Sequence, residues 1–226
     1  MKRGWREWGL RVVILMAGLT VAHLGVTLFL VSDLGSDPFN VLVQGTYRTL
    51  DRLLGWQALT HGRVHIAISL LIILILLLTD RSYVKLGTVL CMVCGGPIID
   101  FFTTLLGPAL GRIASLPGRI AMLAVGCVIL AFGMTIVIRS DAGTGPNDLV
   151  AVVISDKLGR KFSVTRVIVD GAFILGGFLM GGVVGVGTVI CMVLVGPVAG
   201  VFLPVSGRLV DGLVARFCPE GTAAGK

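Results

Sequence analysis

Aspartate residues embedded in apolar sequence are the side chains of this chain best suited to chemistry. Six of them lie in or beside long apolar runs: Asp33, Asp37, Asp100, Asp141, Asp148 and Asp170. A charge at the centre of a membrane costs about 3 kcal/mol on insertion scales, so such residues are usually paired, neutralised or turned toward a cavity. They are therefore the first candidates for a binding site.

Four of these aspartates belong to two similar turns, SDLGSDP at 32–38 and SDAGTGPND at 140–148. A helix that follows such a turn offers free N–H groups and a partial positive charge, and paired Gly/Pro-interrupted segments in two halves are typical of transporter sites. The turns thus predict a substrate site, although a structural turn whose Asp caps the next helix is the alternative. The candidate residues are Asp33, Gly35, Asp37, Pro38 and Asn40 in the first turn and Asp141, Gly143, Pro146, Asn147 and Asp148 in the second.

The remaining candidates are set apart by asymmetry. Asp148 occupies the position that Asn40 has in the first turn, which favours the second turn as the charged one. Asp170 follows Arg166 by four residues, a spacing at which two side chains of one helix can pair. Asp100 has Gly200 as its counterpart, so its acid is not demanded by the repeat described below.

The elements that must position these residues are transmembrane helices. The chain has 226 residues, 55% hydrophobic and only 14% charged, against about 25% charged in soluble domains. Its apolar runs approach the roughly 20 residues that a bilayer core requires, and only helices satisfy their own backbone there. These runs cover residues 10–31, 64–79, 84–106, 119–138, 164–184 and 187–205, the second being marginal in length.

An internal repeat organises the runs. An offset of 108 residues places Arg11 on Arg119 and the first turn on the second, and an offset of 100 places GTVLCMVCGGP at 87–97 on GTVICMVLVGP at 187–197. We expect one all-α membrane domain over 1–226, with pseudo-symmetric repeats at about 11–107 and 119–205. Each repeat comprises three long transmembrane helices, the last interrupted at Gly-Pro, and one short helix after the Gly/Pro turn.

Two topologies remain open, because the short helices at about 38–50 and 146–158 can re-enter or cross. Re-entry gives six spans and inverted repeats; crossing gives eight spans and parallel repeats. Thirteen residues reach only about 20 Å, which favours six, whereas the distribution of Lys and Arg mildly favours eight. In both cases we expect a bacterial inner-membrane protein with both termini in the cytoplasm.

Three glycines, Gly177, Gly181 and Gly185, recur at every fourth position. On one helix they would form a flat stripe that permits close helix contact. The stripe predicts packing inside the protein or a homo-oligomer formed through these residues, and it predicts that Gly181 cannot accept a large side chain.

Other functional classes are not favoured. The net charge of +7 comes from basic residues near helix ends, which indicates contact with lipid headgroups rather than with nucleic acid. Cys91-x-x-Cys94 has no second Cys/His pair beside it, so membrane-helix packing is the better interpretation. Enzyme motifs are missing from the sequence, and we expect no enzyme activity, cofactor or metal.

The two turns, together with the Gly-Thr…Gly-Pro segments at 87–97 and 187–197, resemble the YczE-like bacterial membrane proteins, which look related to the YitT group. The resemblance extends from about Arg11 to Val205. It departs at Asn40, where that family often has Asp, while Asp148 keeps the acid. Transport is what the resemblance implies.

We therefore expect a transporter of a small polar solute, with its site near the two turns. The alternative is an accessory or regulatory membrane protein that acts through helix–helix contacts. Transport predicts a water-accessible polar cavity between the halves, whereas the alternative predicts a dry core with its polar residues paired.

Overall fold

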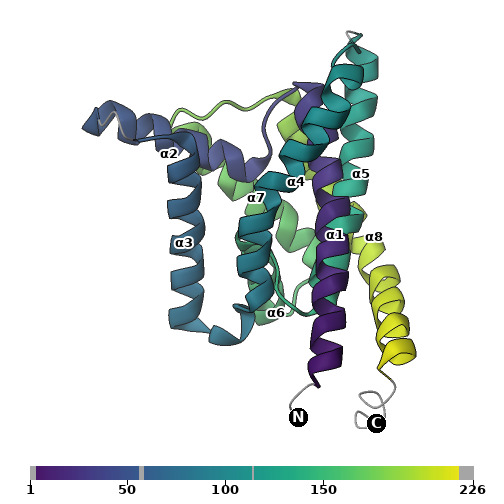
Figure 1. Cartoon of the computed structure of the whole chain (residues 1–226). Coiled ribbons are helices and arrows are strands. Elements are labelled where there is room, and N and C mark those ends of the chain that lie inside the picture. Colours follow the sequence, from purple (N-terminus) through teal and green to yellow (C-terminus); the bar gives the residue numbers. More distant parts are fainter. Residues whose placement is uncertain (1–3, 56–58, 114, 219–226) are drawn as a thin grey trace.

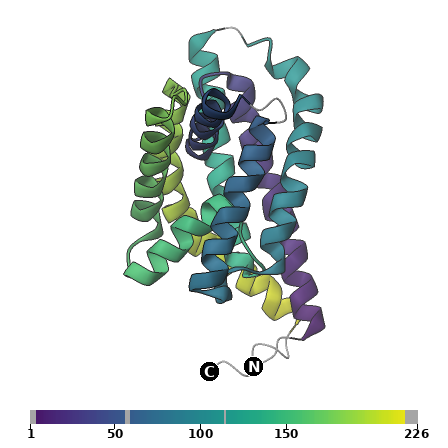
Figure 2. The same ribbon diagram turned by 90° about the vertical axis from the view of Figure 1, so that its left-hand side faces the viewer.

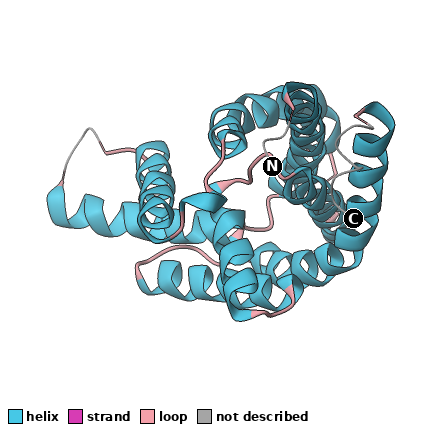
Figure 3. Cartoon of the chain, turned by 90° about the horizontal axis from the view of Figure 1, so that it is seen from below, coloured by secondary structure: helices cyan, strands magenta, loops and turns pink. Residues whose placement is uncertain are grey.

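The computed structural model describes residues 4–55, 59–113 and 115–218. Within these residues the chain is helical throughout, with helices joined by short loops (Figure 3). The elements are α1 Trp5–Ser32, α2 Pro38–Leu54, α3 His61–Thr79, the 3-10 turn η1 Arg81–Tyr83, α4 Leu86–Leu110, α5 Leu116–Ser140, α6 Pro146–Leu158, α7 Phe162–Leu179 and α8 Val186–Phe217. The predicted all-α membrane fold is confirmed.

Six helices, α1, α3, α4, α5, α7 and α8, are long and apolar enough to cross a membrane. The short helix α2 does not cross the molecule, because α1 ends and α3 begins at the same end (Figure 1). The short helix α6 does the same at the opposite end, where α5 ends and α7 begins. The arrangement is therefore that of six spans, with both termini at one end. The polar second half of α2, with Arg48, Asp51 and Arg52, explains why this helix stays at the surface.

The core of the molecule is the antiparallel contact of α1 with α5. Glycines make this contact close: a Cβ on Gly25 would lie 2.5 Å from the Gly126 carbonyl oxygen, and one on Gly133 would lie 2.7 Å from that of Gly18. Backbones approach this closely only where side chains are absent.

These two glycine contacts are equivalent under the 108-residue offset, which places Gly18 on Gly126 and Gly25 on Gly133. Contacts between the turns and the long helices also come in pairs. The Gly87 amide, at the start of α4, donates to the Ala142 carbonyl at 2.9 Å, and the Gly187 amide, at the start of α8, donates to that of Leu34 at 2.9 Å. Each half thus holds the turn of the other, while the repeat itself stays a prediction from the sequence.

The two halves differ in their outer helices. α7 packs against both α2 and α8, whereas α3 packs mainly against α2 and α6. Figure 2, viewed from the side of α3, shows this helix in front of the other long helices. Only 17% of the apolar 18-residue stretch of α3 is buried inside the protein, and only 11% of the corresponding stretch of α4. These two helices are therefore the most exposed to lipid of the six long helices.

The predicted glycine stripe is wrong. The run expected at 164–184 is helical only to Leu179, so Gly181 lies in the α7–α8 loop and Gly185 precedes α8. Gly177 packs against the Val41 carbonyl of α2. The three glycines share no helix face, because the helix that would align them ends early. Formation of a homo-oligomer stays a prediction.

Gly181 also fails the predicted test of close packing. A Cβ there meets no atom within 4 Å, and the residue instead has a φ of +88°. Glycine is therefore favoured at position 181 by a backbone conformation that residues with a side chain rarely adopt, and not by a close helix contact.

Two further boundaries differ from expectation. The helices expected to be interrupted at Gly-Pro are continuous: α4 runs through Pro97 and α8 runs through Pro197 to Phe217. A proline removes one backbone hydrogen bond without ending a long helix that is held by its neighbours. The first short helix also continues beyond Leu50 to Leu54, whereas the second has the predicted bounds.

Candidate functional site

The two turns have the same backbone shape. Asp33 and Asp141 both take the left-handed conformation, with φ of 50° and 55°, and Gly35 and Gly143 follow with φ of 146° and 143°. Glycine is required at both positions for a second reason, which is close packing. A Cβ on Gly35 would lie 2.8 Å from Thr188 Oγ1, and one on Gly143 would lie 2.4 Å from the Thr88 amide nitrogen. The sequence pattern Asp-x-Gly is thus explained by conformation and close approach.

The first aspartate of each turn lies near the surface, at opposite ends of the molecule (Figure 1). Asp33, whose side chain is 95% exposed, lies 3.2 Å from Arg119 Nη2. Asp141 pairs with Lys85 Nζ. These two predicted site residues therefore do not meet, and each forms an ion pair at the end of the protein.

Asp37 caps α2 as predicted. Its Oδ1 accepts hydrogen bonds from the amides of Phe39 and Asn40, both at 3.1 Å, and its Oδ2 accepts one from Asn40 Nδ2. Pro38 fills the first helical position. The first turn is thus internally satisfied by capping.

The second turn is capped differently. Gly145 stands at the N-cap of α6 and provides no side-chain hydrogen bond. Pro146 begins the helix, Asn147 lies beside Gly145, and Asp148 is free to bond elsewhere. Asp148 Oδ1 accepts a hydrogen bond from Arg166 Nη1 on α7.

Arg166 joins two acids from different helices. Its Nε donates to Asp170 Oδ2 at 2.8 Å, which confirms the predicted pair within α7. Together with the bond to Asp148, this makes one buried group of Asp148, Arg166 and Asp170, which we call the charge cluster. Its side chains are 19%, 8% and 1% exposed, respectively.

The charge cluster faces both halves of the protein. Asp37 of α2 acts electrostatically on Asp170, and Asp148 acts on His23 of α1 and Cys91 of α4. Sequence reasoning did not name Arg166 as a site residue, although an Arg inside an apolar run was itself the available signal.

Asp100 does not belong to the charge cluster. It lies on α4 and is exposed at the surface of this helix, as is the preceding Gly96. Its repeat counterpart Gly200 packs against Ser163 of α7, and Gly196, the counterpart of Gly96, packs against the same residue. The face of α4 that carries Asp100 has no such cover in the described chain, since α3 lies elsewhere.

A polar cavity of about 780 Å³ opens at the end of the molecule that carries the termini. It extends to the second turn, where Gly143, Thr144 and Leu149 form part of its wall. Residues of both halves line it, and the charged ones are Arg11, Lys85, Arg139, Asp141, Asp156, Arg160 and Asp211. From α6 the lining residues are Leu149, Val152, Ser155 and Asp156, so the cavity borders the helix that carries Asp148, although no charge-cluster residue lines it.

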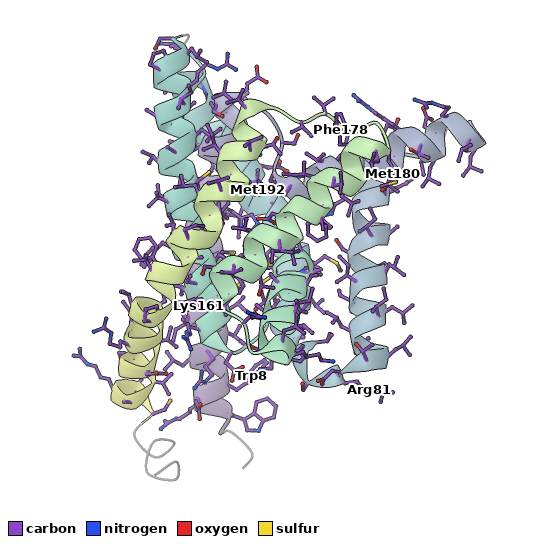
Figure 4. The ribbon with its side chains drawn as sticks, turned by 180° about the vertical axis from the view of Figure 1, so that it is seen from behind. Trp8, Arg81, Lys161, Phe178, Met180 and Met192 are labelled. Carbon is purple, nitrogen blue, oxygen red and sulfur yellow. The ribbon has the colours of Figure 1, made fainter. Side chains whose placement is uncertain are left out.

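At the opposite end of the described chain, α2 and the end of α7 are in contact. A Cβ on Gly45 would lie 2.1 Å from the Gly177 carbonyl oxygen, so the two backbones touch. Figure 4 shows Phe178 and Met180 at this end and Trp8 and Arg81 at the other.

Three side chains of α2 fasten the α7–α8 loop, and we call these bonds the latch. Arg48 Nη1 donates to the Gly181 carbonyl at 2.7 Å, and Thr49 Oγ1 donates to that of Met180 at 2.9 Å. Gln44 Oε1 accepts from the Val183 amide at 2.7 Å. The cavity thus lies at the terminus end of the described chain, and the latch lies at the other end.

Comparisons with known proteins agree with the membrane fold. The family of unknown function DUF6198 matches residues 9–204. The chain is 30% identical over 212 residues to the uncharacterized membrane protein YczE of Bacillus subtilis (strain 168), covering 93% of this chain and 94% of the relative. This confirms the resemblance seen in the sequence, while the relation to the YitT group stays a prediction.

Two further relatives cover most of the chain. An uncharacterized protein of Haemophilus influenzae is 28% identical over 208 residues, which are 91% of this chain and 88% of the relative. The uncharacterized protein YyaS of Bacillus subtilis is 26% identical over 192 residues, which are 84% and 91%. No solved structure matches the chain.

Proposed function

Since the chain belongs to DUF6198, a family of unknown function, we propose from its own geometry that it transports a small polar solute across the bacterial inner membrane. The observation that carries this proposal is the polar cavity, which is lined by both halves and reaches α6 beside the charge cluster. Ionisable residues inside membrane segments commonly mark substrate, ion or proton pathways.

The closed end supports the same function. A transporter exposes its site to one side of the membrane at a time, largely by movement of one repeat against the other. Here the cavity opens at the terminus end, while the Gly45–Gly177 contact and the latch close the other end. The paired turn contacts provide a basis for a second state in which the two ends exchange roles.

The open end is the cytoplasmic one in this proposal. Cytoplasmic loops of membrane proteins carry an excess of Lys and Arg. The end with the termini carries more of these residues than the other end does. They are Arg6, Arg11, Arg81, Lys85, Arg139, Lys157, Arg160, Lys161, Arg208 and Arg216, against Arg48, Arg52, Arg63, Arg112 and Arg119 at the opposite end.

A reversible lock tests transport directly. The short Thr49 side chain reaches the Met180 carbonyl at 2.9 Å, so the two residues are neighbours, and formation of a disulfide between cysteines at these positions is verified first. A metabolite-uptake screen on cells with and without the protein first identifies the solute. In the Thr49→Cys/Met180→Cys variant, oxidation should then stop uptake, and a reductant should restore it.

The Thr49→Cys and Met180→Cys single variants are the controls, because both retain the native cysteines but cannot form the cross-link. Uptake that continues in the fully cross-linked protein would contradict transport through movement of the latched end. A screen that finds no solute whose level depends on the protein would contradict the proposal as a whole.

An accessory role is the second candidate, and the exposed face of α4 at Gly96 and Asp100 favours it. In the second half, α7 covers the corresponding positions Gly196 and Gly200. A partner helix could cover this face of α4. This role predicts that the cellular phenotype of the protein is unchanged by the cross-link and is lost with Gly96→Leu.

A further inference from the structure

The charge cluster holds more negative than positive charge. Arg166 is the single cation between the carboxylates of Asp148 and Asp170, each of which accepts one of its hydrogen bonds. Asp37 of α2 adds a further negative charge that acts on Asp170. Charges in a low-dielectric interior are stable when they are balanced. Within the charge cluster itself one carboxylate is in excess, and Asp37 adds to this imbalance.

One oxygen of Asp170 is also without a hydrogen bond. Its Oδ2 accepts from Arg166 Nε at 2.8 Å, but its Oδ1 is buried and has no partner among the described residues. The residue is 1% exposed. A buried carboxylate oxygen that accepts no hydrogen bond is strongly destabilised unless its charge is removed.

From the excess charge and the open oxygen we propose that Asp170 Oδ1 is a site of reversible proton binding. A hydronium ion gives its proton to Oδ1, a new O–H bond forms there, and water is released. The cluster then changes from net negative to neutral, with Arg166 still paired to Asp148. Hard metal cations need several oxygen ligands at once, whereas a proton needs only this one atom.

The groups that face Asp170 come from four helices. Arg166 lies on α7 itself, Asp148 on α6 and Asp37 on α2, and the Cys191 thiol of α8 also interacts with Asp170. The counterpart of Asp170 in the first half is Leu70, so the repeat does not provide a second copy of this site.

Exposure increases stepwise from Asp170 to the cavity. The side chain of Asp170 is 1% exposed, that of Arg166 8% and that of Asp148 19%. Leu149, the neighbour of Asp148, lines the cavity. Asp148 is therefore the most exposed member of the cluster, and we expect protons to reach the cluster through it from the cavity end.

Coupling of this proton to the solute rests on the proposed function, but proton binding itself does not. Infrared spectroscopy of the purified full chain in lipid nanodiscs tests the binding, because a protonated carboxylic acid has a C=O band that a carboxylate lacks. We expect a band that disappears as the pH is raised and shifts in D₂O. Asp170→Asn should remove it, and Asp170→Glu should retain a titrating band.

Asp51→Asn is the matched control, since Asp51 is an exposed acid near the end of α2, and it should leave the band unchanged. Size-exclusion profiles show whether each variant is folded. The proposal is overturned if the wild-type protein has no such band, or if the band persists in folded Asp170→Asn protein, which would assign it to another acid such as Asp100.

Uptake with and without a proton gradient separates the two proposals. A titrating Asp170 band with uptake that ignores the gradient would leave the proton site standing and remove its coupling to the solute. A titrating band in a protein that transports nothing would remove the proposed function alone.

Discussion

Asp148 is the residue at which the two turns differ in both charge and role. Its counterpart Asn40 bonds to Asp37 within the cap of α2, whereas Asp148 leaves its own turn and binds Arg166. A side chain that only capped a helix could be exchanged between Asp and Asn at little cost. A carboxylate that pairs with a buried Arg cannot be replaced by an amide without loss of that charge interaction.

We therefore expect Asp148→Asn to lower uptake about tenfold, equivalent to about 1.4 kcal/mol, while protein abundance is unchanged because Asp170 still pairs with Arg166. The converse Asn40→Asp should have a milder effect, since that side chain lies in a satisfied cap. Initial uptake rates, normalised to protein in the membrane, provide the measurement. Wild-type uptake by Asp148→Asn would remove the second turn from the site.

Two neighbouring glycines of α7 test the packing at the closed end. A Cβ on Gly177 would lie 2.4 Å from the Val41 carbonyl oxygen, whereas one on Gly176 would meet only Leu42 Cδ1 at an ordinary 3.5 Å. Gly177→Ala should therefore lower the melting temperature in detergent. Gly176→Ala should be neutral or stabilising by up to about 1 kcal/mol, because Ala is the better helix former.

Equal melting temperatures for the two glycine variants would show that α2 and α7 do not touch as described. The same measurement with Gly181→Ala examines the loop. There the expected loss is about 1–3 kcal/mol from the positive φ, without a steric contact.

At the scale of elements, the asymmetry between α3 and α7 distinguishes the two ends of the protein. α7 lies on α2 and α8, and its following loop is latched by hydrogen bonds from α2. α3 is mostly surrounded by lipid, and Ser82, Tyr83 and Lys85 of the loop after it form part of the cavity wall. The latched loop and the open loop therefore occupy corresponding places in the two halves.

Loosening the latch should open the closed end. Arg48→Ala removes a hydrogen bond to the Gly181 carbonyl, and at this exposed position we expect a loss of about 1 kcal/mol. Hydrogen exchange of the amides at 180–184 should then become about fivefold faster. Arg52→Ala, which removes an exposed Arg one turn further along α2, is the control and should leave this exchange unchanged.

Faster exchange in both Arg variants would indicate a general loss of charge rather than loss of the latch. No change in either would mean that the Gly45–Gly177 contact alone keeps the end closed.

At the scale of the whole molecule, six spans predict which loops share a side. Reporter fusions after Gly55 and after Gly111 should lie outside the cytoplasm and activate alkaline phosphatase. Fusions after Gly159 and at both termini should lie inside and give fluorescent protein. Eight spans would instead place Gly55 in the cytoplasm, so an inactive phosphatase at this position decides against the topology described.

Much of the architecture follows from the sequence alone. Apolar runs in lipid must be helices, since no water is there to satisfy the backbone. Pro38 and Pro146 mark the first residues of the short helices because proline fits the first helical position. The pairing of Arg166 with Asp170 also follows from local spacing, since residues four apart meet on one helix.

The tertiary structure alone decided where the polar groups act. The bond of Asp148 to Arg166 joins two helices, so no spacing along the chain predicts it. The end of α7 at Leu179 depends on the α2 backbone against which Gly177 and the following loop pack. The two halves are similar in sequence but differ in packing and in charge balance, because both depend on neighbours that are distant in sequence. Helix formation in a membrane depends instead on the segment itself.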